Sequence, residues 1–336
     1  MTPPFRESPT LLLPPTPAGI ARAAELLRAG ELVAFPTETV YGLGADATSG
    51  EAVARIYAAK ERPRFNPLIA HYPDRDSAAR DGRFDDAAER LARAFWPGPL
   101  TLVVPKSAGC AISDLAGAGL DSVALRVPSH PLARALLAET GRPVAAPSAN
   151  RSGRVSPTCA AHVLADLDGR IAAVLDGGTT DVGVESTIVS CVGARPALLR
   201  PGGVTRETIA AVLGFAIDEP RSADTAAPVA PGQLASHYAP RARVRLNANA
   251  IAPGEAALLF GAPLPGTEQA AAHVNLSESG DLGQAAARLF ASLRALDRPG
   301  IACIAVAPVP GVGLGEAIND RLKRAAAPRP QGTPEQ

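Results

Sequence analysis

The sequence predicts an α/β protein built from two domains. Its 336 residues exceed the roughly 100–200 residues of a single domain. Short apolar runs of strand length alternate with amphipathic stretches of helical period, which is the pattern of an α/β fold. Residues 218–240, rich in Pro, Ala and Ser, interrupt this alternation and indicate a linker between the domains.

The elements of the first domain follow one another at short intervals. A helix over 17–28 places its apolar residues on one face and ends before Gly30, a good residue for a helix C-cap. After it we expect the strand 31–35, the helix 50–60, the strand 68–72, the helix 87–96, the strands 100–104 and 123–127, the helix 131–139, the strand 144–148, the helix 160–167 and the strands 172–176, 186–190 and 197–200. Small turns join the last three strands, so we expect a mixed sheet.

The second domain is smaller. We expect strands at 244–246, 256–260 and 301–307 and helices at 282–296 and 316–326, a spacing that suits a small three-layer α/β domain. The tail from residue 327 is expected to be disordered. At the N-terminus the apolar run is only three leucines long, too short for a signal peptide or a membrane span, so we expect a cytoplasmic protein.

Composition argues against several classes of function. Lys plus Arg and Asp plus Glu both number 33, so there is no global positive field to hold a polyanion. The four cysteines lie far apart and form no CxxC pair, which argues against a zinc site and for reduced thiols. The motifs HxxxH and GxSxG are absent from the sequence, which disfavours zinc and serine hydrolases.

Polar residues gather after the first buried strand, in PTETVYGLG (36–44). Ligands bind at such strand ends, although a simple polar turn would have the same composition. The next cluster is KERPRFNPLIAH (60–71), in which Pro63 forces Arg62 out of the helix, so that it can converge with Lys60 on a triphosphate. The side-chain amide of Asn66 would add a third contact. The alternative is a solvated basic helix end.

Two later loops, PSANRSGRVSPT (147–158) and GGTTDVGVESTI (177–188), are rich in small hydroxyl and amide residues. Such residues let donors approach phosphates closely, and they are equally typical of plain turns. Arg126 and Arg200 stand in or beside apolar strands, where an unpaired charge is costly. Each therefore needs an anionic partner, which is either a protein carboxylate or a ligand.

In this order, the motifs PTETVYGLGADA, KERPRFNPLIAH, WPGPLTLVV, AAPSANRSGRVSPT, GVESTI and LLRPGG closely resemble those of the threonylcarbamoyl-AMP synthases with a YrdC-like catalytic domain. The linker APGQLASHYAP and the domain after it resemble the two-domain branch of that family, although Gln233 and Ser236 replace its usual methionine and basic residue. The resemblance implies an open, twisted, mixed sheet with a large concave cavity, followed by a smaller Rossmann-like domain. We expect an N-terminal extension (1–16), a catalytic domain (17–205), a connecting helix and linker over the active site (206–240) and the second domain (241–326).

The resemblance also implies which residues form the site. The catalytic residues would be Lys60, Arg62, Ser148 and Asn150, which together would hold the ATP phosphates and a magnesium ion. The ATP-binding residues would be Arg62, Asn66, Ser122, Ser148, Ser156, Arg200 and Tyr238. The L-threonine-binding residues would be Thr39, His71, Arg126, Ala146 and Ser186. We assign no metal ligand to a protein side chain, because Mg²⁺ would arrive with ATP.

The activity implied by the resemblance begins with attack of the L-threonine amine on bicarbonate. The resulting N-carboxylate attacks the α-phosphorus of ATP and expels pyrophosphate. The product would pass to the tRNA threonylcarbamoyl transferase machinery, which modifies the adenosine next to the anticodon. We expect a monomer that binds tRNA directly only weakly or not at all.

Two other functions deserve comparison. A basic cavity would also suit an RNA-binding protein without catalysis, but zero net charge and 4% aromatic residues argue against it. A carbamoyl transferase of metal-cofactor maturation has a similar domain. Such proteins also carry zinc-finger and acylphosphatase-like regions, for which this chain has no room.

Overall fold

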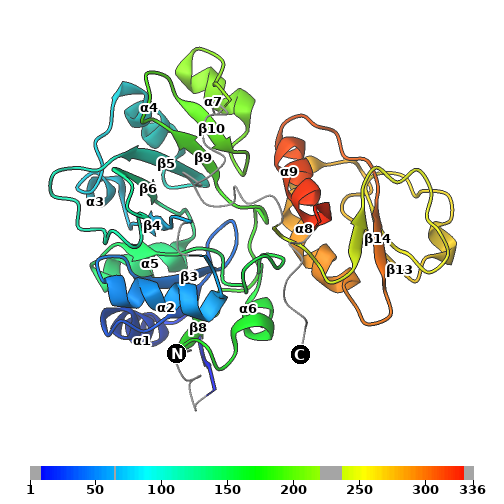
Figure 1. The fold of residues 1–336 in the computed structure, drawn as a ribbon, viewed down its shortest axis with the longest axis horizontal. Helices are drawn as coiled ribbons and strands as arrows, with labels where there is room; N and C mark the ends of the chain where they lie inside the picture. Colours follow the sequence, from blue (N-terminus) through cyan, green and yellow to red (C-terminus); the bar gives the residue numbers. More distant parts are fainter. Residues whose placement is uncertain (1–8, 64–65, 220–236, 329–336) are drawn as a thin grey trace. The chain divides into compact units, whose positions relative to one another are not determined.

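The computed structural model describes residues 9–63, 66–219 and 237–328. They form two compact units (Figure 1). The larger unit contains a ten-stranded mixed sheet and the smaller one a four-stranded parallel sheet. The smaller unit comprises the described residues from 237 onwards together with Gly153–Val155. The predicted α/β class is therefore confirmed, whereas the division of the chain at 205 and 240 and the large concave cavity stay predictions.

The first unit contains both helices and strands in nearly continuous alternation. Its strands are β1 (Leu11–Leu13), β2 (Val33–Phe35), β3 (Gly42–Asp46), β4 (Ile69–His71), β5 (Leu100–Pro105), β6 (Ser122–Arg126), β7 (Val144–Ala145), β8 (Ala173–Leu175), β9 (Thr187–Ser190) and β10 (Ala197–Arg200). Its helices are α1 (Pro17–Arg28), α2 (Gly50–Lys60), α3 (Arg75–Ala78), α4 (Asp86–Phe95), α5 (Pro131–Thr140), α6 (Ala160–Leu167) and α7 (Arg206–Leu213). The strand order is β1-β8-β2-β3-β7-β4-β6-β5-β9-β10. The pairs from β1 to β2 are parallel and those from β2 to β4 antiparallel, and from β4 to β10 the two kinds alternate, so the sheet is mixed as expected.

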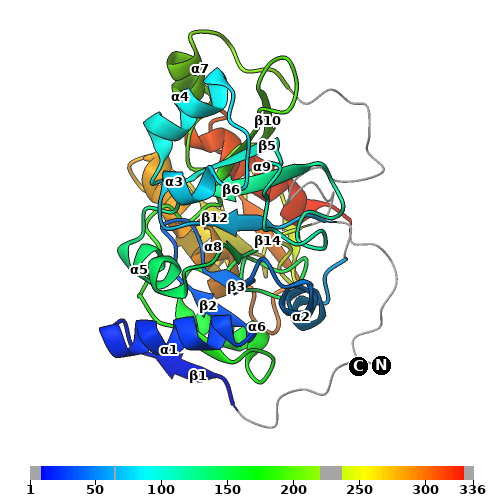
Figure 2. The same cartoon turned by 90° about the vertical axis from the view of Figure 1, so that its left-hand side faces the viewer.

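The helices cover the two faces of this sheet unequally. Helices α2, α4, α6 and α7 contribute to the apolar core on one face. On the other face, α1 and α5 pack over β2, β7 and β8. Figure 2 shows α1 and α5 on one side of β2 and β3, and α2 and α6 on the other. The strands β4, β6, β5 and β9 share only a small apolar cluster on the second face, made of Ile69, Val103, Ala124 and Ile188.

Helix boundaries follow local sequence signals. Helix α1 begins where the Thr16 hydroxyl accepts a hydrogen bond from the Gly19 amide, and Pro17 occupies its first turn. Helix α2 begins at the Ser49 cap and ends at Glu61, whose backbone is left-handed with φ 54°. The helices expected at 17–28 and 50–60 are confirmed at both ends.

Some elements differ from the sequence expectation. The segment 42–46 was expected to be a loop but forms β3, which pairs with β2 and β7. A Cβ atom on Gly44 would lie 2.9 Å from the Phe35 ring and 3.0 Å from the Val33 carbonyl oxygen, so this pairing requires glycine. Strand β1, within the expected N-terminal extension, pairs in parallel with β8 and is therefore part of the sheet. The short α3 was also not expected.

The second unit has the architecture of a small Rossmann-like domain. Its strands are β11 (Arg243–Arg245), β12 (Ala256–Leu259), β13 (Ala272–Asn275), which was not expected, and β14 (Cys303–Val306). They are parallel, in the order β11-β14-β12-β13. Helix α8 (Leu282–Leu296) packs on β12 and β13, and α9 (Leu314–Ala326) packs on β11 and α8. A 3₁₀-helix, η1 (Thr267–Gln269), precedes β13.

Part of the sequence-based prediction falls on residues that the structure does not describe. Gln233 and Ser236 of the linker and the tail from 329 onwards belong to this part. Within the described ranges, each helix is too short or too polar to cross a membrane.

Candidate active site

One face of the central strands carries polar side chains. Successive side chains of a strand point to opposite faces, so Arg126 of β6 shares the face of Ala124 in the small apolar cluster. The same alternation places His71 of β4 and Thr101 of β5 on this face. The register pairs His71 with Arg126, and extending the β5–β6 register by one residue places Thr101 on the other side of Arg126. Three polar side chains thus form a row across adjacent strands.

Arg126 has a protein carboxylate as its partner. Its Nη2 donates hydrogen bonds to Glu38 Oε1 at 2.7 Å and to Thr39 Oγ1 at 2.9 Å. The other oxygen of Glu38 accepts a hydrogen bond from the backbone amide of Ser129 at 3.1 Å. Side chains of Arg126 and Glu38 are only 5% and 7% exposed. The Nε of Arg126 is buried without a hydrogen-bond partner in the described part of the chain, so Arg126 keeps one donor for a ligand.

The turn before β3 fixes the position of Thr39. The Thr37 hydroxyl donates to the Val40 carbonyl at 2.7 Å and accepts hydrogen bonds from the amides of Thr39 and Val40. It also lies 2.8 Å from the Thr39 hydroxyl. The sequence left a polar turn and a ligand site as alternatives for this segment, and the turn brings Glu38 and Thr39 to Arg126.

His71 is neutral in this environment. Burial, with the positive charge of Arg126 as a second cause, lowers the pKa of His71 to about 3. Its Nδ1 lies 3.1 Å from the Ile69 carbonyl oxygen, so Nδ1 carries the proton and donates it. Ala146, the one backbone position predicted for threonine, donates its amide hydrogen to the same carbonyl at 3.0 Å. His71 and Ala146 therefore lie together beside Arg126.

Ser186 and Arg200 lie at the β9 end of the polar row. The Ser186 and Thr101 hydroxyls are 2.8 Å apart. The Arg200 guanidinium donates to the Ser186 carbonyl from Nε at 3.1 Å and from Nη2 at 2.9 Å, and to the Ser186 hydroxyl at 3.2 Å. The Arg200 side chain thus holds Ser186 in place through the carbonyl oxygen of Ser186.

Lys60 is buried and joins two of the predicted motifs. Its Nζ donates to the carbonyl oxygens of Ser148, at 2.5 Å, and of Asn150. Burial, followed by the positive charge of Arg62, lowers the pKa of Lys60 well below its usual value. Because Lys60 is 1% and Arg62 8% exposed, the alternative of a solvated basic helix end is wrong.

Arg62 follows α2, and Asn66 precedes β4. The left-handed Glu61 takes Arg62 out of the helix, as Pro63 predicted. Asn66 is fully buried, and neither atom of its side-chain amide has a hydrogen-bond partner among the described residues. A buried amide without partners costs about 1–3 kcal/mol, so this amide suits a ligand. Extending the β4–β6 register by two residues places Ser122 beside Pro67, next to Asn66.

The remaining predicted residues are Ser156 and Tyr238. The buried Ser156 hydroxyl donates to Glu185 Oε1 at 2.6 Å. Tyr238 belongs to the second unit, where its ring stacks on Phe290 with 5.4 Å between centroids and lies 5.5 Å from the Arg321 guanidinium carbon. Hydrogen bonds therefore join some of the predicted residues in pairs, such as Arg126 with Thr39, Arg200 with Ser186, and Lys60 with the carbonyl oxygen of Ser148. Ser156 bonds to a residue that was not predicted, Tyr238 belongs to the second unit, and the binding roles of all these residues stay predictions.

Three buried residues of this region were not predicted as site residues, namely Glu38, Thr101 and Glu185. Glu38 and Glu185 stand within motifs that the sequence singled out. Their signal is a carboxylate beside a buried strand, which requires a positive or hydrogen-bonding partner. Thr101 has no such signal, because a threonine is common in any strand.

A mixed sheet that carries a buried arginine, a neutral histidine and hydroxyl groups on one face belongs to the class of α/β proteins suited to binding a small polar ligand on the sheet face. Family models divide the chain into two matches. Residues 25–202 match the family Sua5_yciO_yrdC, described as "Telomere recombination". Residues 204–327 match "Threonylcarbamoyl-AMP synthase, C-terminal domain". The chain belongs to the threonylcarbamoyl-AMP synthase family, and the resemblance of its motifs is confirmed.

Individual relatives are similar to this chain along most of its length. It is 45% identical over 325 residues to threonylcarbamoyl-AMP synthase of Bacillus subtilis (strain 168), covering 92% of this chain and 93% of that protein. It is 42% identical over 329 residues to threonylcarbamoyl-AMP synthase of Pyrococcus abyssi, covering 91% and 94%. The structure is similar to that of P. abyssi Sua5 complexed with L-threonine, with a TM-score of 0.85 and 37% identity over 94% of this chain and 97% of that one.

Proposed function

We propose that this chain is an L-threonylcarbamoyladenylate synthase, a nucleotidyltransferase that converts L-threonine, bicarbonate and ATP into threonylcarbamoyl-AMP and pyrophosphate. The observation that carries the proposal is the buried Arg126. Its Nη2 is hydrogen-bonded to Glu38, and its Nε has no hydrogen-bond partner among the described residues. The chain that contains Arg126 is related along most of its length to proteins named threonylcarbamoyl-AMP synthase.

Arg126 would bind the carboxylate of L-threonine. A guanidinium N–H and a carboxylate form a charge-assisted hydrogen bond worth about 1.5–3 kcal/mol. Glu38 already neutralises part of the charge and fixes the orientation of the guanidinium, so little reorganisation is needed on binding. The hydroxyls of Thr39 and Ser186 and the neutral His71 would surround the rest of the amino acid, since each is buried on or beside the same row.

Lys60, Arg62 and Asn66, together with the loop at 148–150, would bind the triphosphate. Lys60 and Arg62 supply positive charge, and the unsatisfied amide of Asn66 supplies a donor and an acceptor. Anionic phosphates near Lys60 would favour its protonated form and so oppose the effect of burial. Among the described residues no three His, Cys, Asp or Glu side chains gather as a metal site. Because the phosphate oxygens of ATP are themselves Mg²⁺ ligands, we assign Mg²⁺ to the substrate, held by the phosphates and water beside Ser148 and Asn150.

The reaction needs positioning more than a nucleophile from the protein. The threonine amine attacks the bicarbonate carbon, and water leaves to give the N-carboxylate. A carboxylate oxygen then attacks the α-phosphorus of ATP, the bond to the β-phosphate oxygen breaks, and pyrophosphate leaves. Holding three reactants in line lowers the entropic barrier, and Lys60 and Arg62 stabilise charge that develops on the phosphates.

The setting of this reaction is also part of the proposal. The four cysteines are free thiols, which fits a reducing compartment such as the cytoplasm. We propose a monomer whose product passes to the enzyme that transfers the threonylcarbamoyl group to tRNA, for the N6-threonylcarbamoyladenosine next to the anticodon.

The first test is pyrophosphate release from Mg²⁺-ATP by the full-length protein. Release is expected only when L-threonine and bicarbonate are both present, with L-serine as the control amino acid. Release that depends on a different acyl acceptor would leave the fold assignment unchanged and show that L-threonine is not the substrate. No release under any condition, together with salt-sensitive retention of tRNA in a mobility-shift assay, would favour the RNA-binding alternative.

A further inference from the structure

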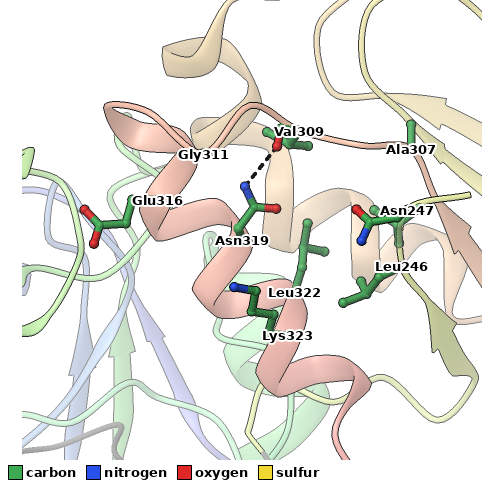
Figure 3. Close-up of a pocket in the computed structure, with 10 residues that line it drawn as sticks. Leu246, Asn247, Ala307, Val309, Gly311, Glu316, Asn319, Leu322 and Lys323 are labelled. Atoms are coloured by element: carbon green, nitrogen blue, oxygen red, sulfur yellow. Dashed lines mark hydrogen bonds between the residues drawn. The ribbon is translucent and has the colours of Figure 1, made fainter.

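The second unit contains a pocket that the proposed reaction does not use. It has a volume of about 290 Å³, close to the lower end of the range for ligand pockets, roughly 300 Å³. It lies beyond the carboxyl ends of the parallel strands β11 and β14 and beside α9 (Figure 3). In open α/β sheets, ligands bind at this edge.

One side chain presents a fixed hydrogen-bond acceptor to the pocket. The Nδ2 of Asn319 donates to the carbonyl oxygens of Gly315 at 2.9 Å, Val309 at 3.0 Å and Pro310 at 3.4 Å. These contacts hold the NH₂ group against the loop before α9, so that Oδ1 must point the other way. Figure 3 shows this oxygen on the side of Ala307 and Asn247. None of the described residues donates a hydrogen bond to it.

A second amide faces the same space. Asn247 follows β11, has φ 52°, and lines the pocket. Its side chain is exposed and makes no hydrogen bond to the described residues, and in Figure 3 its amide points into the pocket. Asn247 therefore offers one donor and one acceptor near the fixed acceptor of Asn319.

The rest of the lining combines apolar side chains with two charged ones. Leu246, Val306, Val309 and Leu322 line the pocket, and its two charged residues, Glu316 and Lys323, have opposite signs. The pocket therefore has no net charge to select an ion. A neutral lining in which apolar side chains lie next to two amide groups suits a flat, uncharged ring that carries hydrogen-bonding groups on its rim.

We propose that this pocket binds an adenine nucleoside. An asparagine amide pairs with the N6 amino group and N7 of adenine through one acceptor and one donor, which is what Asn247 offers. The second hydrogen of the N6 amino group would bond to Asn319 Oδ1, and the ring would lie against Leu246 and Leu322. Inosine, in which a carbonyl oxygen replaces the amino group, would place two acceptors against each other at Asn319.

Titration of the full-length protein with adenosine tests the proposal, with methyl NMR as the readout. Leu246, Val306, Val309 and Leu322 supply methyl reporters in the pocket itself, so binding to the first unit would shift different signals. We expect adenosine to shift these four residues and inosine to bind at least about ten-fold more weakly, as for loss of one base contact. No reactants or turnover are needed, so the outcome is independent of the proposed synthase activity.

A matched pair of variants locates the site. Asn247→Gly removes the amide and keeps a residue that tolerates positive φ, so the fold is retained. Asn249→Gly removes an exposed asparagine that does not line the pocket. We expect adenosine affinity to fall about ten-fold in the first variant and to stay unchanged in the second. The proposal is overturned if adenosine leaves the four methyl reporters unmoved, if inosine binds equally well, or if both variants bind like the wild type.

Discussion

Among the site residues that the sequence did not predict, Glu38 is the one whose substitution should lower the stability of the protein most. Its carboxylate is the described anionic partner of Arg126, 2.7 Å from Nη2, and both side chains are almost fully buried. Removing one partner of a buried pair leaves an uncompensated charge, at a cost of about 3–5 kcal/mol. For a unit of about 200 residues, this corresponds to a fall in melting temperature of about 6–20 °C. We expect this result for Glu38→Ala.

The measurement can be confined to the first unit. Trp96 is the single tryptophan of the chain and lies in that unit, so its fluorescence during urea unfolding does not report on the second unit. This matters because a two-unit chain need not unfold in one step. Arg126→Ala and the double variant complete a cycle, in which the double variant should lose less stability than the sum of the single ones, by about 0.5–3 kcal/mol.

A second substitution at Glu38 tests whether this residue positions Arg126. Glu38→Gln keeps a side chain of the same shape without its charge, and should raise the KM for L-threonine more than it lowers kcat. Additive effects in the cycle, or a Glu38→Ala variant within about 0.5 kcal/mol of the wild type, would refute the reasoning from the buried pair.

Three further predictions concern the first unit. Arg62→Ala should lower the rate of pyrophosphate release about 10²–10³-fold, as for loss of a preorganised donor. Arg83→Ala, at an exposed arginine, should leave this rate unchanged. Equal rates in the two variants would show that Arg62 is not part of the site. Because the pKa of His71 is lowered to about 3, the unfolded state binds more protons between about pH 6.5 and pH 3, so stability to urea should fall by up to about 1.4 kcal/mol per pH unit below 6.5. His71→Gln should flatten this slope, and an unchanged slope would contradict the assignment. A Cβ at Gly202 would lie 2.4 Å from the Glu185 carbonyl oxygen and 2.4 Å from the Thr187 amide nitrogen, so Gly202→Ala should lower the free energy of unfolding by about 1–3 kcal/mol through overpacking. A Cβ at Gly193 has its nearest atom at 3.8 Å, so Gly193→Ala should unfold at the wild-type urea concentration.

Much of the fold could be predicted from local patterns. The apolar period of α1 and the glycine after it predicted where this helix ends, and the apolar runs located most of the strands. Strand β3 was missed because two glycines lower its strand propensity, and because its identity as a strand depends on pairing with β2 on one side and with β7, about one hundred residues later in the sequence, on the other. Strand β13, with its mixture of polar and small residues, was missed for a similar reason.

For the candidate site, the sequence by itself determined the composition of the motifs, the exit of Arg62 from its helix and the need of Arg126 for an anionic partner. Each of these depends on neighbouring residues or on the cost of burying a charge. The tertiary structure alone decided that this partner is Glu38, that Lys60 bonds to the carbonyls of the loop at 148–150, and that the amide of Asn66 is left without a partner. Such contacts join residues up to about ninety positions apart, and their geometry depends on strand register and on how the sheet brings distant loops together.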